Sequence, residues 1–328
     1  MKRLIYPDIC KFIAIFLVTW SHCAQCIAGK TWTNLFGGTE LDIAFNMPLF
    51  MMISGWFINP QKLRALKPQD YFLSKFKRLV IPSLVWYTLH LIIINKQLIF
   101  SSSAIYWYFY AWTNYFWYLN ALFFCLLIIY FFSKVLRSDF YCCIISTTLV
   151  LACPISHIAN INFMYPYIWA GYGVSRLFSN RNIKSYISIC FIIGLTLCLF
   201  WNHSFTVYER PLETLHINLN MITSYIYRFS IGFCISAVII YIMKRYENTF
   251  LRNFASLGQY SLIIYTASII LLDIISTVLN NLQLHINQVI ILDLLSLCLC
   301  IIIIYFIIIF AKICRKHRWL KLLLMGEQ

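Results

Sequence analysis

Residues 288–311 read QVIILDLLSLCLCIIIIYFIIIFA, an apolar run whose only charged side chain is Asp293. At 1.5 Å per residue, a helix of this length exceeds the roughly 30 Å of hydrocarbon in a bilayer. Soluble domains seldom need so long an uninterrupted apolar helix. The run therefore predicts a transmembrane helix.

Similar runs recur along the whole chain, which is 61% hydrophobic and only 11% charged. Soluble domains average roughly 45–50% apolar and about 25% charged residues. We predict an all-α, polytopic integral membrane helical bundle that forms a single domain over residues 1–328. The expected spans number about ten and lie near residues 9–28, 41–58, 79–99, 116–133, 140–157, 162–178, 185–201, 222–243, 256–279 and 288–311.

The formal net charge of +15 follows the predicted loops rather than one basic patch. Of the 26 lysines and arginines, 21 fall in alternate loops or near the two ends of the chain, including a basic tail at about 312–328. The positive-inside rule therefore places both termini in the cytoplasm and requires an even number of spans. We expect membrane lipid, and no nucleic acid, as a partner.

Thirteen cysteines lie mostly inside the apolar segments, where free thiols usually pack as small hydrophobic side chains. Cys23 and Cys26 form a CxxC pair. This spacing alone could also suggest a metal or redox site, but no second pair or set of ligands accompanies it. We expect packing, and no metal.

Two longer loops on the non-cytoplasmic side, near 100–115 and 202–221, are rich in aromatic and polar residues. They are typical of an aromatic belt at the membrane interface. A sugar-binding lip is the alternative.

Ionisable side chains inside predicted spans are candidates for function because they are costly in lipid unless they are paired or face a cavity. They are Asp8, Lys11, His22, Asp42, His90, Arg228, Asp273 and Asp293. Lys11 and His22 are separated by eleven residues, so a helix places them on one face, about 16 Å apart along its axis.

The first span, YPDICKFIAIFLVTWSHCAQ at 6–25, contains Asp8, Lys11 and, after ten further residues, His22. This pattern resembles the opening of acyltransferase family 3, the membrane O-acyltransferases that modify bacterial surface glycans. In that family an aspartate precedes an Arg or Lys, and a functional histidine follows at this spacing. The resemblance implies a multi-pass protein of the bacterial cytoplasmic (inner) membrane.

Two further motifs follow in the family's order. NMPLFMMISGWF at 46–57 is similar to its Pro-Leu-Phe and Ser-Gly pattern, which places Ser54 in a motif position. KFKRLVIPSLVW at 75–86 resembles its pair of basic residues before a span, with Lys75 where the family often has arginine and Arg78 as the second.

The later matches extend the resemblance to the ninth predicted span. FWYLNAL at 116–122 resembles the family's Trp-aromatic-Leu, at Trp117. LGQYSLIIYTAS at 257–268 resembles its Gly-x-x-Ser-Leu-x-x-Tyr, which ends at Tyr265. The order and spacing of the five matches, rather than any single one, carry the resemblance.

Two departures concern histidines. Many relatives have histidine immediately before the Met-Pro-Leu-Phe motif, where this chain has Asn46, and another three residues after the late tyrosine, where it has Ser268. The first change replaces a proton carrier with an amide.

The resemblance implies transfer of an acyl group, expected to be acetyl, from acetyl-CoA to a sugar hydroxyl. Acetyl-CoA is then a donor substrate, and no bound cofactor is expected. Such a transfer needs a base for the hydroxyl proton, a donor to the oxyanion and exclusion of water. An unperturbed imidazole pKa of about 6.5 suits His22 for the base, while Lys11 would orient the donor or pair with Asp8.

The donor phosphates are expected near Lys75, Lys77 and Arg78, although Lys77 fits ordinary positive-inside charge equally well. Arg228 would bind an anionic acceptor, such as a lipid-linked pyrophosphate, or else form an ion pair with Asp42. The remaining candidates for substrate binding are Asn46, Ser54, Trp117 and Tyr265.

Three alternatives remain open at this point. A related enzyme would transfer another acyl group, such as succinyl. A transporter or flippase of a glycan or lipid precursor predicts paired hydrophobic repeats, and none is found. A catalytically decayed relative is compatible with Asn46 and Ser268. The acceptor sugar and the oligomeric state do not follow from the sequence.

Overall fold

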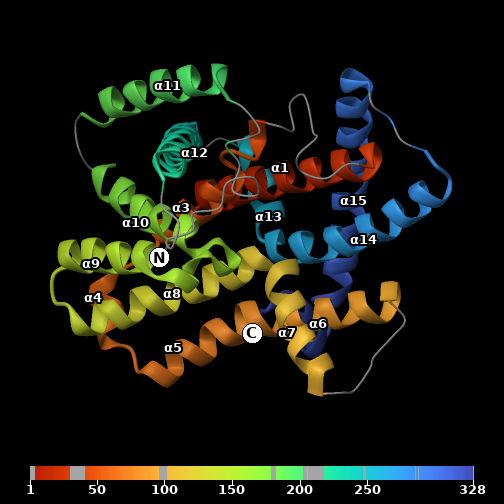
Figure 1. Ribbon diagram of the computed structural model, residues 1–328, viewed down its shortest axis with the longest axis horizontal. Coiled ribbons are helices and arrows are strands. Elements are labelled where there is room, and N and C mark those ends of the chain that lie inside the picture. The colour runs from red at the N-terminus through yellow and green to blue at the C-terminus, as the bar shows by residue number, and fades with distance from the viewer. Residues whose placement is uncertain are drawn as a thin grey trace.

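The computed structural model describes residues 4–29, 41–95, 102–178, 182–201, 205, 218–246, 249–284, 286 and 288–327, and no strand occurs within these ranges (Figure 1). The α-helices are α1 (Tyr6–Ala28), α3 (Asn46–Trp56), α4 (Pro60–Ala65), α5 (Pro68–Lys75), α6 (Ile81–His90), α7 (Ser102–Tyr115), α8 (Trp117–Val135), α9 (Asp139–Ala152), α10 (Ile161–Leu177), α11 (Ile183–Leu199), α12 (Leu219–Arg245), α13 (Thr249–Gly258), α14 (Ser261–Asn281), α15 (Val289–Cys314) and α16 (Arg318–Met325). Two π-helical turns, η2 (Phe76–Val80) and η3 (Leu91–Asn95), and a 3₁₀ segment, η4 (Pro154–Asn160), complete the set.

Six helices in these ranges are long and apolar enough to cross a membrane: α1, α8, α12, α14, α15 and the continuous helix Pro68–Ile94. The chain is thus a multi-pass helical membrane protein, but the expected count of about ten spans is not confirmed. The other four predicted spans fall on shorter helices. At 1.5 Å per residue, the 11 residues of α3 reach only about 16 Å, roughly half the hydrocarbon thickness.

Local sequence features determine where several helices begin and end. Pro7 occupies the first turn of α1, where its missing N–H is tolerated, and Gly29 ends the helix in a left-handed conformation, with φ 60°. The basic 59–78 segment, which we predicted as a loop, is itself largely helical, so the third span begins earlier than expected. Most of the loop predicted at 202–221 lies outside the described residues.

Helices α1 and α3 lie at the centre of the arrangement. In Figure 1, α8, α9 and α10 lie to one side and α14 and α15 to the other, with α1 between them. Helix α1 packs against α3, α12, α13, α14 and α15, while α3 packs against α10 and α12. The two helices that carry the first two motifs therefore occupy the core.

Two glycines permit the close contact between α3 and α10. A Cβ on Gly55 of α3 would lie 1.9 Å from the carbonyl oxygen of Ile168, and a Cβ on Gly171 of α10 would lie 2.0 Å from that of Met52. Any larger side chain would push the two backbones apart. The Ser-Gly motif thus has a packing role in bringing α3 against α10.

Candidate active site

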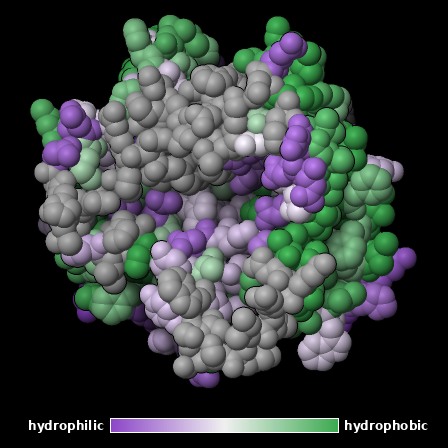
Figure 2. All heavy atoms as spheres, turned by 45° about the vertical axis from the view of Figure 1, so that its right-hand side comes forward, coloured by the Kyte–Doolittle hydropathy of each residue, from purple (hydrophilic) through white to green (hydrophobic). Residues whose placement is uncertain are grey.

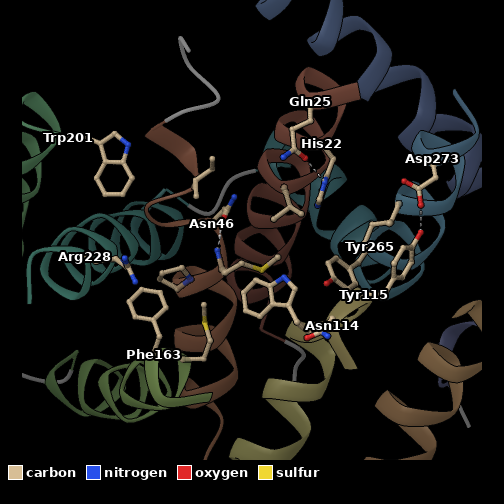
Figure 3. A pocket seen from close by; sticks show the side chains of 17 residues that line it. His22, Gln25, Asn46, Asn114, Tyr115, Phe163, Trp201, Arg228, Tyr265 and Asp273 are labelled. Atoms are coloured by element: carbon tan, nitrogen blue, oxygen red, sulfur yellow. Dashed lines mark hydrogen bonds between the residues drawn. The ribbon is translucent and has the colours of Figure 1, made fainter. Parts of the chain in front are cut away.

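A cavity of about 400 Å³ lies among α1, α3, α8, α10, α12 and α14, and we call it the histidine cavity. Figure 3 shows His22 and Gln25 of α1 on one side of it and Arg228 of α12 on the other, with Asn46 between them. Trp117 and Tyr265 also line it. Five residues that the sequence predicted for catalysis or substrate binding therefore share one cavity.

His22 is held by its neighbour on the next turn of α1. The Nδ1 atom of His22 lies 3.1 Å from Oε1 of Gln25. A carboxamide oxygen only accepts hydrogen bonds, so Nδ1 donates its proton to Gln25 and, in the neutral ring, Nε2 carries the lone pair. This tautomer is the one that can act as a base at Nε2.

Asn46 and Arg228 contribute hydrogen-bond donors to the histidine cavity. The Oδ1 atom of Asn46 accepts from the backbone N–H of Met47 at 2.6 Å, so its amide NH₂ group is left for other partners. The Nε atom of Arg228 donates to the carbonyl oxygen of Phe205, and its guanidinium lies 5.0 Å from the ring centre of Phe163.

The alternative of an ion pair between Arg228 and Asp42 is wrong. The ion pairs of the described residues do not include it, and Asp42 instead accepts a hydrogen bond of 2.5 Å from the hydroxyl of Ser21. Arg228 is buried, 3% exposed, and lines the histidine cavity.

A cluster that the motifs did not reveal closes one wall of the histidine cavity. Asp273 of α14 accepts a hydrogen bond from the hydroxyl of Tyr115, and Nε2 of His90 lies 3.1 Å from the same carboxylate oxygen. The rings of His90 and Tyr115 are 4.4 Å apart. His90 and Asp273 were noted only as ionisable residues in spans, because nothing in the sequence pairs α6 with α14.

A second cavity, of about 560 Å³, lies at the other end of α1, and we call it the basic cavity. Its lining includes Lys11, Arg78, Arg315 and Lys321 as cations and Asp8 and Glu327 as carboxylates. Ser54 of α3 also lines it, with its hydroxyl donating to the carbonyl oxygen of Phe50. Figure 2 shows one face of the molecule, which is hollowed at its centre. Hydrophilic side chains gather in this hollow, and hydrophobic side chains lie along its flank.

The structure separates the basic residues of the candidate donor site. Lys11 forms an ion pair with Asp8, at 3.2 Å. Arg78 lines the basic cavity, and Lys77 lines a small hollow beside it. Lys75 lines neither, because its ammonium group lies 5.2 Å from the ring centre of Tyr71.

Tyr265 lines both cavities. Its ring contacts those of Phe116 and Tyr118, at centroid distances of 6.0 and 5.9 Å, and Tyr118 in turn lies 5.5 Å from Phe50. Helix α1 passes along the whole arrangement, with Lys11 at the basic cavity and His22 at the histidine cavity. Tyr265 and its aromatic neighbours therefore form a partition between the two cavities.

No cysteine is among the described residues that line the histidine cavity or the basic cavity. All thirteen are free, and Cys23 and Cys26 are buried. Over the residues that the structure describes, no group of three or more His, Cys, Asp or Glu side chains is placed to hold a metal ion. Cys23 and Cys26 lie in the buried core, where Sγ of Cys26 is 3.5 Å from the carbonyl oxygen of Leu272.

These features define a class: a multi-pass membrane protein with a histidine-bearing polar cavity inside its helices. A family model described as an acyltransferase domain, that of acyltransferase family 3, matches residues 4–323. The chain belongs to this family, and it is a membrane acyltransferase. No curated protein and no solved structure matches the chain significantly.

Proposed function

We propose that the chain is an O-acyltransferase of the bacterial cytoplasmic membrane, which moves an acetyl group from acetyl-CoA to a sugar hydroxyl. The sugar belongs to a cell-surface polysaccharide, a glycolipid or a lipid-linked precursor. One observation carries the proposal: in a chain of this family, the cavity with His22 and the cavity with the cations meet at Tyr265.

The basic cavity suits the phosphates of the donor. Its excess of cations favours polyanions and, by the positive-inside rule, supports a cytoplasmic location for this end of the bundle and for both termini. The thin pantetheine arm then extends along α1 towards His22. The distance between Lys11 and His22, about 16 Å along the helix axis, is one that the extended arm can bridge.

The histidine cavity suits the chemical step. Nε2 of His22 takes the proton of the acceptor hydroxyl, and the hydroxyl oxygen forms a bond to the thioester carbonyl carbon. The amide NH₂ group of Asn46 donates to the oxyanion that results. When the C–S bond breaks, the CoA sulfur leaves and takes the proton from His22, which restores the neutral imidazole.

The acceptor enters the histidine cavity from the side that bears Arg228. A buried guanidinium in a membrane protein favours an anionic ligand, which supports a lipid-linked sugar phosphate or pyrophosphate as the acceptor. Trp117 offers its ring face to the sugar.

Mass spectrometry of surface glycans tests this function. We would compare cells that carry the intact gene, a deletion, His22→Ala and His317→Ala at matched membrane abundance. His317 is an exposed histidine outside both cavities and is the matched control. We expect a mass increment of one acetyl group that depends on the gene, survives in His317→Ala and falls about 10²–10⁴-fold in His22→Ala.

The outcomes separate the competing functions. An acetyl increment that persists in His22→Ala removes His22 from the base role. A glycan whose acylation is unchanged by deletion, while its export changes, supports a transporter instead.

A further inference from the structure

The chain beyond α15 folds back onto the basic cavity. The indole N–H of Trp86 on α6 donates to the carbonyl oxygen of Leu324, at 3.0 Å, which anchors α16. Gly326 ends α16 in the left-handed region, with φ 63°, and the N–H of Glu327 donates to the carbonyl oxygen of Lys321, at 3.2 Å. This turn returns the Glu327 side chain towards the cavity.

Two cations hold the Glu327 carboxylate there. Arg315 meets both of its oxygens, with Nε 3.1 Å from Oε2 and Nη2 2.5 Å from Oε1. Nζ of Lys321 lies 3.9 Å from Oε2. The Arg315 guanidinium is further fixed 4.0 Å from the ring centre of Tyr260. Arg315 and Lys321 therefore form a preformed anion site.

The same site is large enough for more than a carboxylate. The fork of an arginine matches phosphate as well as carboxylate, and the cavity around it measures about 560 Å³. Arg78 lines the same cavity, and no hydrogen bond or ion pair within the described part of the chain occupies its guanidinium. A Cβ on Gly326 would lie 2.2 Å from the carbonyl oxygen of Arg78, so the turn that carries Glu327 packs directly against Arg78.

From this geometry, and resting on the proposed function, we infer that Arg315 and Lys321 form a binding site for the phosphates of the acyl donor, and that Glu327 occupies this site in the free protein. The donor must displace the Glu327 carboxylate to bind. Glu327 therefore acts as an internal competitor, and the α16 turn is a latch on the basic cavity.

Substitution of the two partners separates a competitor from a structural support. If Glu327 competes, Glu327→Gln raises the fraction of protein that is competent to bind and lowers the Kd of acetyl-CoA several-fold. If Glu327 only positions Arg315, the same variant loosens Arg315 and raises the Kd. Arg315→Gln should raise the Kd by roughly ten- to a hundredfold, the loss of charge-assisted hydrogen bonds.

The experiment is equilibrium binding of acetyl-CoA to the full chain in phosphatidylcholine nanodiscs, with turnover measured in parallel. The variants are Glu327→Gln, Arg315→Gln, the double variant and Lys316→Gln. Lys316 is an exposed cation on the same segment, outside the basic cavity, so its variant should bind like the original protein. We expect the double variant to resemble Arg315→Gln, because the latch has no effect once its site is gone.

S-acetylpantetheine, which lacks the nucleotide and all phosphates, provides the second probe. Its turnover should be the same in Glu327→Gln and Arg315→Gln as in the original protein, whereas a general loss of folding would reduce it. If acetyl-CoA binds and its Kd is the same in Arg315→Gln and Glu327→Gln as in the original protein, the inference is overturned and the proposed function stands. If neither the original protein nor any variant binds acetyl-CoA, the proposed donor is wrong, and the inference fails with it.

Anionic lipid is the remaining source of phosphate. Nanodiscs that contain phosphatidylglycerol test it, because a lipid headgroup at Arg315 would weaken acetyl-CoA binding in the original protein but not in Arg315→Gln. Arg315-dependent lipid binding without any acetyl-CoA binding would make the site a lipid site and overturn the inference.

Discussion

The tautomer of His22 depends on one neighbouring oxygen. Gln25 lies one turn further along α1 and accepts from Nδ1, which leaves Nε2 as the basic nitrogen. The family motif ends at His22 and does not extend to this partner. Its position at i+3 on the same helix face is the signal that could have predicted it.

Removal of the Gln25 oxygen should therefore lower the rate of transfer without removing the base. We expect Gln25→Leu to lower kcat by less than His22→Ala does, because the ring can still adopt the active tautomer for part of the time. Steady-state kinetics with acetyl-CoA and acceptor measure kcat in the two variants. Equal losses in the two variants would mean that Gln25 itself contacts the substrate.

Asn46 tests the oxyanion role by an isosteric change. Asn46→Asp keeps the size of the side chain and the acceptor for the N–H of Met47, but replaces the NH₂ donor with an oxygen. A carboxylate beside the developing oxyanion should lower kcat by about 10²–10³-fold, the effect of losing one such donor. Full activity in Asn46→Asp would exclude donation by this amide.

At the scale of the elements, the crossing of α3 and α10 depends on backbone contact. Gly171 and Gly173 lie two residues apart on α10, yet a Cβ on Gly173 would meet nothing within 4 Å. We expect Gly171→Ala to destabilise the protein by at least about 1–3 kcal/mol, because α10 must move away from Met52. Gly173→Ala is the matched control and should stabilise the helix slightly.

Thermal unfolding in detergent, at equal protein concentrations, compares the two variants. A fall in Tm of the same size in both would mean that α10 is sensitive to any added methyl group rather than to the contact with α3.

Sequence patterns predicted the elements better than their lengths. Each of the ten apolar segments overlaps a helix over its described residues, but hydropathy does not register that α3 ends at Trp56 and a new helix, α4, begins at Pro60 with Asn59 as its N-cap. Nor does it register that α13 ends at Gly258, before α14 begins. A Cβ on Gly258 would lie 1.8 Å from the carbonyl oxygen of Asp8, so this break exists to pass the start of α1. Such a requirement arises between distant segments and leaves no local pattern.

The same limit applies to the candidate site. Positions within motifs predicted eight of the residues that line the two cavities, and Arg228 was predicted as an ionisable residue inside a span. Spacing along one helix fixes which face a side chain occupies. The cluster of Asp273, His90 and Tyr115 joins helices far apart in the chain. The contact of Glu327 with Arg315, twelve residues apart, depends on how α16 folds back beside α15. Only tertiary packing brings these residues together.

For the molecule as a whole, Tyr265 separates the basic cavity, which we propose for the acyl donor, from the histidine cavity, which we propose for the acceptor. A transferase must keep water from the thioester until the acceptor is present. Tyr265 and its contacts with Phe116 and Tyr118 lie where the two cavities meet. A smaller side chain there should open the path between them to water.

We therefore expect Tyr265→Ala to lower acetyl transfer and to raise acetyl-CoA hydrolysis in the absence of acceptor, whereas Tyr265→Phe keeps the ring and retains coupling. Release of free CoA thiol, measured with and without acceptor in nanodiscs, gives the ratio of the two reactions. Tyr305→Ala removes an exposed ring on α15 and controls for the loss of an aromatic residue as such. If Tyr265→Ala loses transfer and hydrolysis together while its Tm stays unchanged, Tyr265 binds a substrate and does not form a barrier to water. A rise in hydrolysis confined to Tyr265→Ala would show that the coupling of the two cavities depends on this ring.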